Sequence, residues 1–178
     1  MKKFSIFKFF LLFSFAVLHT SNLMAMKSMQ NFPVVDYKKR DEIGMRKLAK
    51  ESPEFLYFSS VDTRSETVKV IRAEDSLVGF VRYSVQKEDL FNDGNRKKWG
   101  WLKLVGVFPW FQKKGFGREL LLHAFKDMAS RGVHGIYATV EENNQKVARI
   151  VDALGAETVD GYKILTASAL KKITESKK

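Results

Sequence analysis

The residues best suited to bind an anion lie where an apolar run meets a basic, glycine-spaced segment in the second half of the chain. A stretch with the periodicity of an amphipathic helix follows directly. The first N–H groups of a helix have no acceptor within the helix, and the helix dipole adds partial positive charge there. Gly115 and Gly117 lack the Cβ atoms that would hold a ligand away from the backbone, and Lys113 and Lys114 add full charges. This order of strand, loop and helix predicts a site for a phosphate or pyrophosphate group.

Two common phosphate-binding motifs do not fit this segment. A P-loop requires Gly, four residues and then Gly-Lys-Ser/Thr, a pattern that the chain does not contain. The dinucleotide fingerprint requires a third glycine three residues after Gly117, where the chain has Leu120. A Gly-x-Gly alone also occurs in ordinary surface turns, so the neighbouring residues must decide.

Those neighbours follow the pattern Val-x-Pro-x-x-Gln-x-x-Gly-x-Gly, which resembles the first motif of the GNAT family of N-acetyltransferases. The matching residues are Val107, Pro109, Gln112, Gly115 and Gly117. The family's second motif places an asparagine eleven residues before a glycine, and Asn144 and Gly155 have that spacing. The resemblance covers roughly residues 33–167.

The resemblance implies an α/β fold with a mixed, mostly antiparallel sheet, splayed between two strands and covered by helices on both faces. It implies acetyl-CoA as co-substrate, no metal, and direct attack on the thioester by an amine acceptor of unknown identity. It places the thioester carbonyl near the Val107 N–H. The implied cofactor-binding residues are Val105, Gly106, Val107, Gln112, Lys113, Lys114, Gly115, Phe116, Gly117 and Asn144. Asn144 fits a helix N-cap equally well, and the two roles are compatible.

The proton carriers that the family often uses are not at their usual positions. A tyrosine often lies seven residues after the motif asparagine, and a glutamate sometimes lies five residues before it. This chain has Val151 and Thr139 there, so the catalytic residues are unknown. Possible substitutes are Glu141, Glu142, Tyr137 and Tyr162, although residues of these types in such positions are more often structural. An acyl-CoA-binding protein that has lost catalysis is therefore the alternative within the same fold.

Hydrophobic periodicity predicts the elements that position these residues. Helices are expected over 36–51, ended by Pro53, and over 115–130 and 144–154. Strands are expected over 67–73, 77–85, 99–107, 133–140 and 162–166, the last forming a hairpin around Asp160-Gly161. The polar segment 86–98 is predicted to be an exposed loop. The lysine-rich tail after Ala169 is predicted to be frayed.

Composition excludes some functions. The chain has no cysteine, hence no disulfide or thiol chemistry, and its three histidines show no metal-ligand spacing. The formal charge is +11, but the basic residues are spread along the chain, so no dedicated nucleic-acid site is indicated. The charge also allows a basic interaction module for envelope polyanions.

The first 25 residues resemble a secretory signal, because lysines precede a short apolar run that is followed by a polar segment ending at Ala25. The run from Phe9 to Leu18 is too short to span a bilayer. We expect a signal over 1–25, a single domain over 26–178, and export to the periplasm or envelope. A cytoplasmic protein results if translation starts at Met24, Met26 or Met29.

Overall fold

The computed structural model describes residues 32–51, 61–91, 94–140 and 144–175. The predicted signal and the proposed helix end at Pro53 lie outside these residues. Val34–Lys178 form one compact unit of the chain. Its described elements are, in chain order, β1 (Val34–Asp36), α2 (Asp41–Glu51), β2 (Thr67–Ala73), β3 (Ser76–Glu88), β4 (Lys97–Val107), the 3-10 turn η3 (Pro109–Phe111), α3 (Phe116–Ser130), β5 (Gly135–Thr139), α4 (Gln145–Ala153), β6 (Glu157–Val159), β7 (Tyr162–Thr166) and α5 (Ala167–Glu175).

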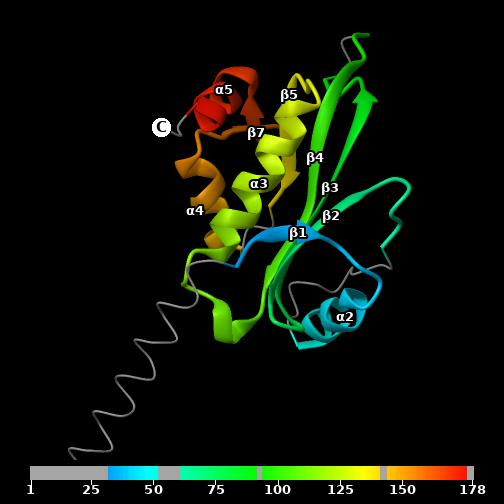
Figure 1. Ribbon diagram of the computed structural model, residues 1–178. Helices are drawn as coiled ribbons and strands as arrows, with labels where there is room; N and C mark the ends of the chain where they lie inside the picture. Colours follow the sequence, from blue (N-terminus) through cyan, green and yellow to red (C-terminus); the bar gives the residue numbers. More distant parts are fainter. Residues whose placement is uncertain (1–31, 52–60, 92–93, 141–143, 176–178) are drawn as a thin grey trace, which may run out of the picture. The chain divides into compact units, whose positions relative to one another are not determined.

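The strands of the described residues form one sheet in the order β1-β2-β3-β4-β5-β7-β6 (Figure 1). Every neighbouring pair is antiparallel except β4 and β5, which run parallel. Parallel strands need a long crossover connection, and α3 supplies it between β4 and β5. The mixed, mostly antiparallel sheet expected from the sequence is confirmed.

The parallel pair opens partway along β4. Pairing runs only from Trp99 opposite Gly135 to Leu102 opposite Ala138, whereas β4 continues to Val107. On its other side, β4 carries a bulge, because Arg82 and Tyr83 of β3 pair with residues 104 and 102 and skip Lys103. A bulge bends a strand and increases its twist, so the second half of β4 diverges from β5.

Helices cover both faces of the sheet (Figure 1). On one face, α3 contributes a row of fully buried side chains at helical spacing: Leu120, Leu121, Ala124, Phe125 and Met128. On the other face, Met45 and Leu48 of α2 pack against Val68, Val70 and Phe80. The apolar positions of both helices follow the 3.6-residue period from which they were predicted.

Two sequence predictions about irregular segments are wrong. The loop predicted over 86–98 is shorter, because β3 extends to Glu88 and β4 begins at Lys97. Gln86 pairs with Trp99 in this extension, so the ladder satisfies backbone groups that a loop would leave to solvent. The described part of the tail after Ala169, residues 170–175, is not frayed but belongs to α5. Its apolar residues Leu170 and Ile173 are buried, and α5 packs against α3 and β7.

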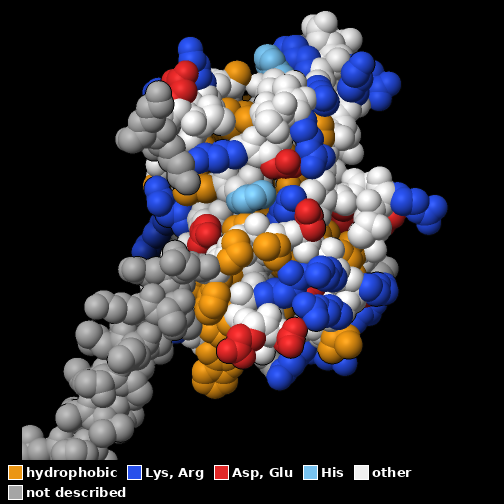
Figure 2. All heavy atoms as spheres, in the orientation of Figure 1, with side chains coloured by type: hydrophobic (Ala, Val, Ile, Leu, Met, Phe, Trp, Pro, Cys, Tyr) orange, Lys and Arg blue, Asp and Glu red, His pale blue; other side chains and the backbone are white. Residues whose placement is uncertain are grey.

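Lysine and arginine side chains are prominent over α2 in Figure 2. The exposed cations of this segment are Lys38, Lys39, Arg40, Arg46, Lys47 and Lys50. Several of them pair with acidic neighbours, since Lys39 and Arg46 both bond Glu42. Within the described part of the chain, no helix is both long enough and apolar enough to cross a bilayer.

Candidate functional site

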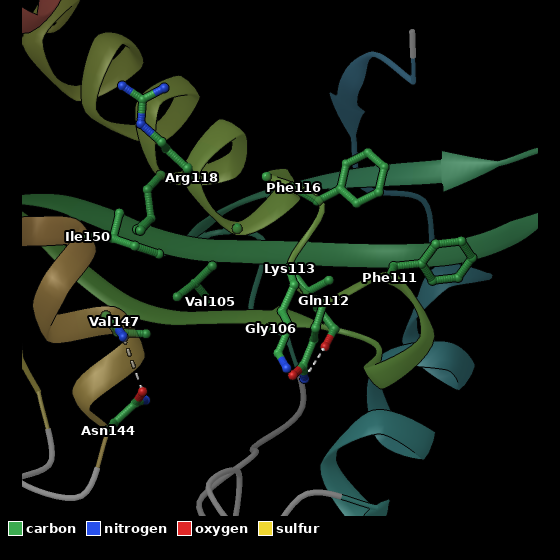
Figure 3. A pocket seen from close by; sticks show the side chains of 14 residues that line it. Val105, Gly106, Phe111, Gln112, Lys113, Phe116, Arg118, Asn144, Val147 and Ile150 are labelled. Atoms are coloured by element: carbon green, nitrogen blue, oxygen red, sulfur yellow. Dashed lines mark hydrogen bonds between the residues drawn. The ribbon is translucent and has the colours of Figure 1, made fainter. Parts of the chain in front are cut away.

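A cavity of about 300 Å³ lies where the end of β4, the start of α3 and the start of α4 converge (Figure 3). The lining residues are Val105, Gly106, Val107, Phe111, Gln112, Lys113, Gly115, Phe116, Gly117, Arg118, Leu121, Asn144, Val147 and Ile150. Every residue that the sequence analysis assigned to cofactor binding is among them, with the exception of Lys114.

The loop between β4 and α3 is shaped by its backbone. Gln112 Nε2 donates a hydrogen bond of 3.1 Å to the Val107 carbonyl oxygen, which ties the loop to the end of β4. Lys113 and Gly115 have φ angles of 61° and 91°, in the left-handed region. The turn that they make sends the chain directly into α3, whose N-cap is Gly115.

The first turn of α3 therefore faces the cavity with its N-terminal end. The Glu119 N–H bonds the Gly115 carbonyl at 3.0 Å, so the N–H groups before Glu119 have no acceptor within the helix. The N-cap residue is a glycine, which has no side chain to cap them. Backbone N–H groups and the positive end of a helix dipole together favour a bound anion.

The absent side chain of Gly117 leaves space for a ligand, and the backbone there is not in the left-handed region. A Cβ built on it would lie 3.7 Å from the nearest side-chain atom outside its chain neighbours, Val107 Cγ2, which is ordinary contact. At Gly115 a Cβ meets nothing within 4 Å, but the positive φ disfavours any side chain. A substitution at Gly117 thus changes the cavity, whereas one at Gly115 also strains the loop.

Cations flank the N-terminus of α3. Lys113 and Arg118 line the cavity and are exposed enough to reach a ligand in it. Lys114 lies outside the lining, with its ammonium 5.6 Å from the centroid of the Phe111 ring. An apolar interior of Val105, Leu121 and residues of α4, with cations at one end, suits a long molecule that is anionic at one end.

The wall opposite β4 comes from α4. Asn144 is its N-cap, since its Oδ1 accepts a hydrogen bond of 3.3 Å from the Val147 N–H (Figure 3). The capping role expected from the sequence is confirmed, and the same residue lines the cavity. Val147 and Ile150 of the lining, together with Phe111 and Leu121, were not assigned to the site from the sequence.

Among the described residues, those that line the cavity include no tyrosine, histidine, aspartate or glutamate that could carry a proton. Val151 is 1% exposed and packs in the core, where it offers no titratable group. Thr139 is exposed at the end of β5. The proposed substitutes Glu141 and Glu142 lie outside the described residues. Tyr162, on the outer hairpin, lies edge-on to Tyr137 at 5.9 Å.

Tyr137 is engaged elsewhere. Its hydroxyl donates a hydrogen bond of 2.6 Å to Glu88 Oε2 and accepts one of 3.2 Å from Gln86 Nε2. Burial and the hydrogen bond to Glu88 raise the pKa of this hydroxyl. Glu88 and Gln86 were assigned to a loop from the sequence, so this polar contact between β3 and β5 was missed.

The described residues contain no group of three or more His, Cys, Asp or Glu side chains arranged to hold a metal ion. His123 lies half-buried on α3 with a buried Nδ1 that has no hydrogen-bond partner, and burial lowers the pKa of its ring. The site as described depends on backbone N–H groups, cations and apolar walls.

Solved structures of acetyltransferases are similar to this chain in fold. NAA60 of Arabidopsis thaliana in complex with acetyl-CoA superimposes with a TM-score of 0.64 at 12% identity, over 78% of this chain and 99% of that one. A GNAT family acetyltransferase of Brucella melitensis with acetyl-CoA gives 0.57 at 16% identity, over 77% and 88%. The paiA N-acetyltransferase of Thermoplasma acidophilum with coenzyme A gives 0.58 at 15% identity, over 76% and 98%.

A search of curated protein sequences gives no significant match. The sequence model of the family described as "Acetyltransferase (GNAT) family" matches residues 28–156, which is most of the chain and includes both motifs. The chain therefore belongs to the acetyltransferase (GNAT) family.

Proposed function

We propose that this protein is an N-acetyltransferase that moves an acetyl group from acetyl-CoA to an amine by direct attack in a ternary complex. The observation that carries the proposal is the cavity, where the N-terminus of α3, its flanking cations and the opening between β4 and β5 meet. Family membership supports acetyl transfer in general, whereas an amine as the acceptor is part of the proposal.

The anionic end of the donor fits the start of α3. Backbone N–H groups of the first turn bind the pyrophosphate, Gly117 leaves the space that it needs, and Lys113 and Arg118 add charge. The apolar side chains of β4 and α4 line the path of the pantetheine arm toward the opening in the sheet.

At that opening, the neutral amine nitrogen attacks the thioester carbon and the carbon–sulfur bond breaks. The amine loses a proton to solvent or a nearby base, and coenzyme A leaves as thiolate. Backbone N–H groups at the end of β4 stabilise the oxyanion. Holding both substrates in contact supplies much of the rate acceleration without a dedicated acid.

The test is calorimetric binding of acetyl-CoA to the native protein and to Gly117→Glu. The added carboxylate enters the space next to Val107 and repels the pyrophosphate, so we expect at least a hundredfold loss of affinity (roughly 3 kcal/mol or more). Ala167→Glu is the matched control, because it adds the same charge at an exposed position outside the lining. Equal affinities for the native protein and Gly117→Glu would reject this site.

A second candidate, favoured by Val151 in the core and by Thr139 at the end of β5, is an acyl-CoA-binding protein without transferase activity. This candidate also predicts that Gly117→Glu weakens acetyl-CoA binding. Thiol release from acetyl-CoA with a panel of primary amines separates the two, since the transferase releases thiol in an amine-dependent way. Tight binding with no thiol release above the rate without protein would favour the second candidate.

A further inference from the structure

A charged cluster lies on the face of the sheet that points away from α3, next to the point where β4 and β5 stop pairing. Gly100 faces α3, because a Cβ on it would lie 2.6 Å from Met128 Sδ. Strand alternation then puts Trp101 on the opposite face, where its ring stacks on Tyr137 at 5.9 Å. Lys103 shares that face, since its Nζ lies 4.6 Å from the Trp101 ring centroid.

This position matters if the proposed function holds. The donor cavity opens on the α3 and α4 side, so an acyl group that reaches the gap between β4 and β5 is met by an acceptor from the other side. Lys103 is the residue at which β4 bulges, directly after the last residue of β4 that pairs with β5. Its side chain therefore stands at the acceptor's approach.

The groups around the Lys103 ammonium are those of a cation-binding site. Its Nζ lies 2.9 Å from Glu66 Oε1 and over the face of Trp101. The other oxygen of Glu66 accepts two hydrogen bonds from Arg82, of 2.9 and 2.6 Å. A carboxylate and an aromatic face would suit an ammonium group of a substrate, but the protein's own lysine is already there.

Two cations of the described residues, Lys103 and Arg82, bond the same carboxylate, that of Glu66, whose side chain is 9% exposed. A more exposed carboxylate nearby, that of Asp62, is bonded by the Arg64 N–H and the Ser65 hydroxyl. Although burial opposes it, hydrogen bonds from Lys103 and Arg82 hold the pKa of Glu66 below its usual value, so the carboxylate stays ionised.

Lys103 keeps donors for a ligand. An ammonium has three N–H donors, one of which meets Glu66, and the Lys103 side chain is 22% exposed, whereas Arg82 is 5% exposed. Lys103 is thus the member of the cluster that a small acceptor reaches. The formal charge of +11 on the whole chain acts in the same direction, because it attracts anionic molecules and repels polycations.

We propose that Lys103 selects the acceptor: amines that also carry a carboxylate are preferred over amines that carry a second ammonium. The Lys103 ammonium binds the acceptor's carboxylate, and its occupation of the place between Trp101 and Glu66 excludes a substrate cation. The proposal deepens the proposed function, and it assigns to Lys103 a role in specificity rather than in the chemical step.

The test compares three primary amines: L-phenylalanine, phenethylamine, which lacks the carboxylate, and cadaverine, which has a second ammonium. Equilibrium binding to the full chain saturated with coenzyme A is measured first, followed by kcat/KM for acetylation. A charge-assisted hydrogen bond at a partly exposed site predicts about tenfold tighter binding of L-phenylalanine than of phenethylamine. Cadaverine should bind more weakly than either.

Lys103→Met should remove the preference for L-phenylalanine and raise the affinity for cadaverine, because it vacates the cation site while Glu66 keeps Arg82. Lys103→Gln removes the charge but retains a donor for Glu66, which guards against a folding defect. Lys97→Met, an exposed lysine of the same strand, is the matched control and should change nothing.

Tighter binding of cadaverine than of L-phenylalanine by the native protein would overturn the proposal. So would unaltered selectivity in both Lys103 variants, or no binding of any of the three amines. Acetyl-CoA affinity is measured separately on the same samples. If the native protein does not bind acetyl-CoA, the proposed function itself is rejected. If the native protein binds acetyl-CoA but shows the wrong amine preference, only the role of Lys103 is rejected.

Discussion

Replacing Asn144 separates two roles that the sequence leaves combined, capping α4 and contacting the acyl donor. Its Oδ1 accepts from the Val147 N–H at 3.3 Å, a long hydrogen bond, while the residue also lines the cavity. Asn144→Ala removes the capping oxygen and the amide donor together. Asn144→Asp retains the capping oxygen, replaces the amide donor by an acceptor and adds a negative charge.

The expected change in the free energy of unfolding differs between the two variants. Loss of an N-cap costs typically about 1 kcal/mol, and the length of this bond argues for the lower half of the range, about 0.5–1 kcal/mol. Such a change lowers the melting temperature by roughly 1–4 °C in a domain of this size. Asn144→Asp should be as stable as the native protein or slightly more so, since a carboxylate at a helix N-terminus is favourable.

Binding gives the second readout. If the Asn144 amide donates to the donor's pantetheine arm, Asn144→Asp should weaken acetyl-CoA by about tenfold or more, because a donor is lost and a buried acceptor faces another acceptor. Thermal denaturation and calorimetry on both variants provide the measurements. Native-like affinity in Asn144→Asp would refute the ligand contact, and native-like stability in Asn144→Ala would refute the energetic importance of the cap.

Three further predictions concern other parts of the chain. Gly79→Ala should destabilise the fold by about 1–3 kcal/mol in denaturant titrations, because its Cβ would lie 2.7 Å from the Gly106 carbonyl oxygen, and an unchanged midpoint would contradict that contact. Hydrogen bonds from Lys39 and Arg46 lower the pKa of Glu42 to about 2 from an ordinary 4.5, so its contribution to stability is present above pH 4.5 and is lost as the pH falls toward 2. Glu42→Gln should flatten the stability profile in that window, and a profile as steep as the native one would remove Glu42 as a cause. Mass spectrometry of the protein from its native host should find a chain that begins after Ala25, whereas an intact Met1 would reject the cleaved signal.

The local elements of the site followed from residue patterns. The helix that begins after Gly115 was placed within one residue, because its apolar positions recur at helical spacing and its start is marked by glycines and cations. The strand over 67–73 coincides with β2, and Asn144 was correctly proposed as a cap. These features depend on neighbours within a few positions along the chain, so the sequence contains their causes.

Errors arose where a distant segment provides the stabilisation. Gln86 and Glu88 are polar and look like loop residues, but they extend β3 because β4 pairs with them and Tyr137 bonds both side chains. The tail was predicted to fray because it is rich in lysine, yet Leu170 and Ile173 bury one face of α5 against the rest of the fold. Short β1 was not predicted, since three residues carry too little pattern.

By itself, the sequence determined the glycine-spaced basic loop and the helix behind it, because the glycines, the cations and the helical periodicity that specify them are adjacent in the chain. Only the tertiary structure decided that Leu121, Val147 and Ile150 line one cavity with this loop, and that Lys103, Glu66 and Trp101 meet on the opposite face. The parallel pairing of β4 with β5 and the bulge at Lys103 produce both juxtapositions, and strand pairing across long separations depends on the packing of the whole sheet.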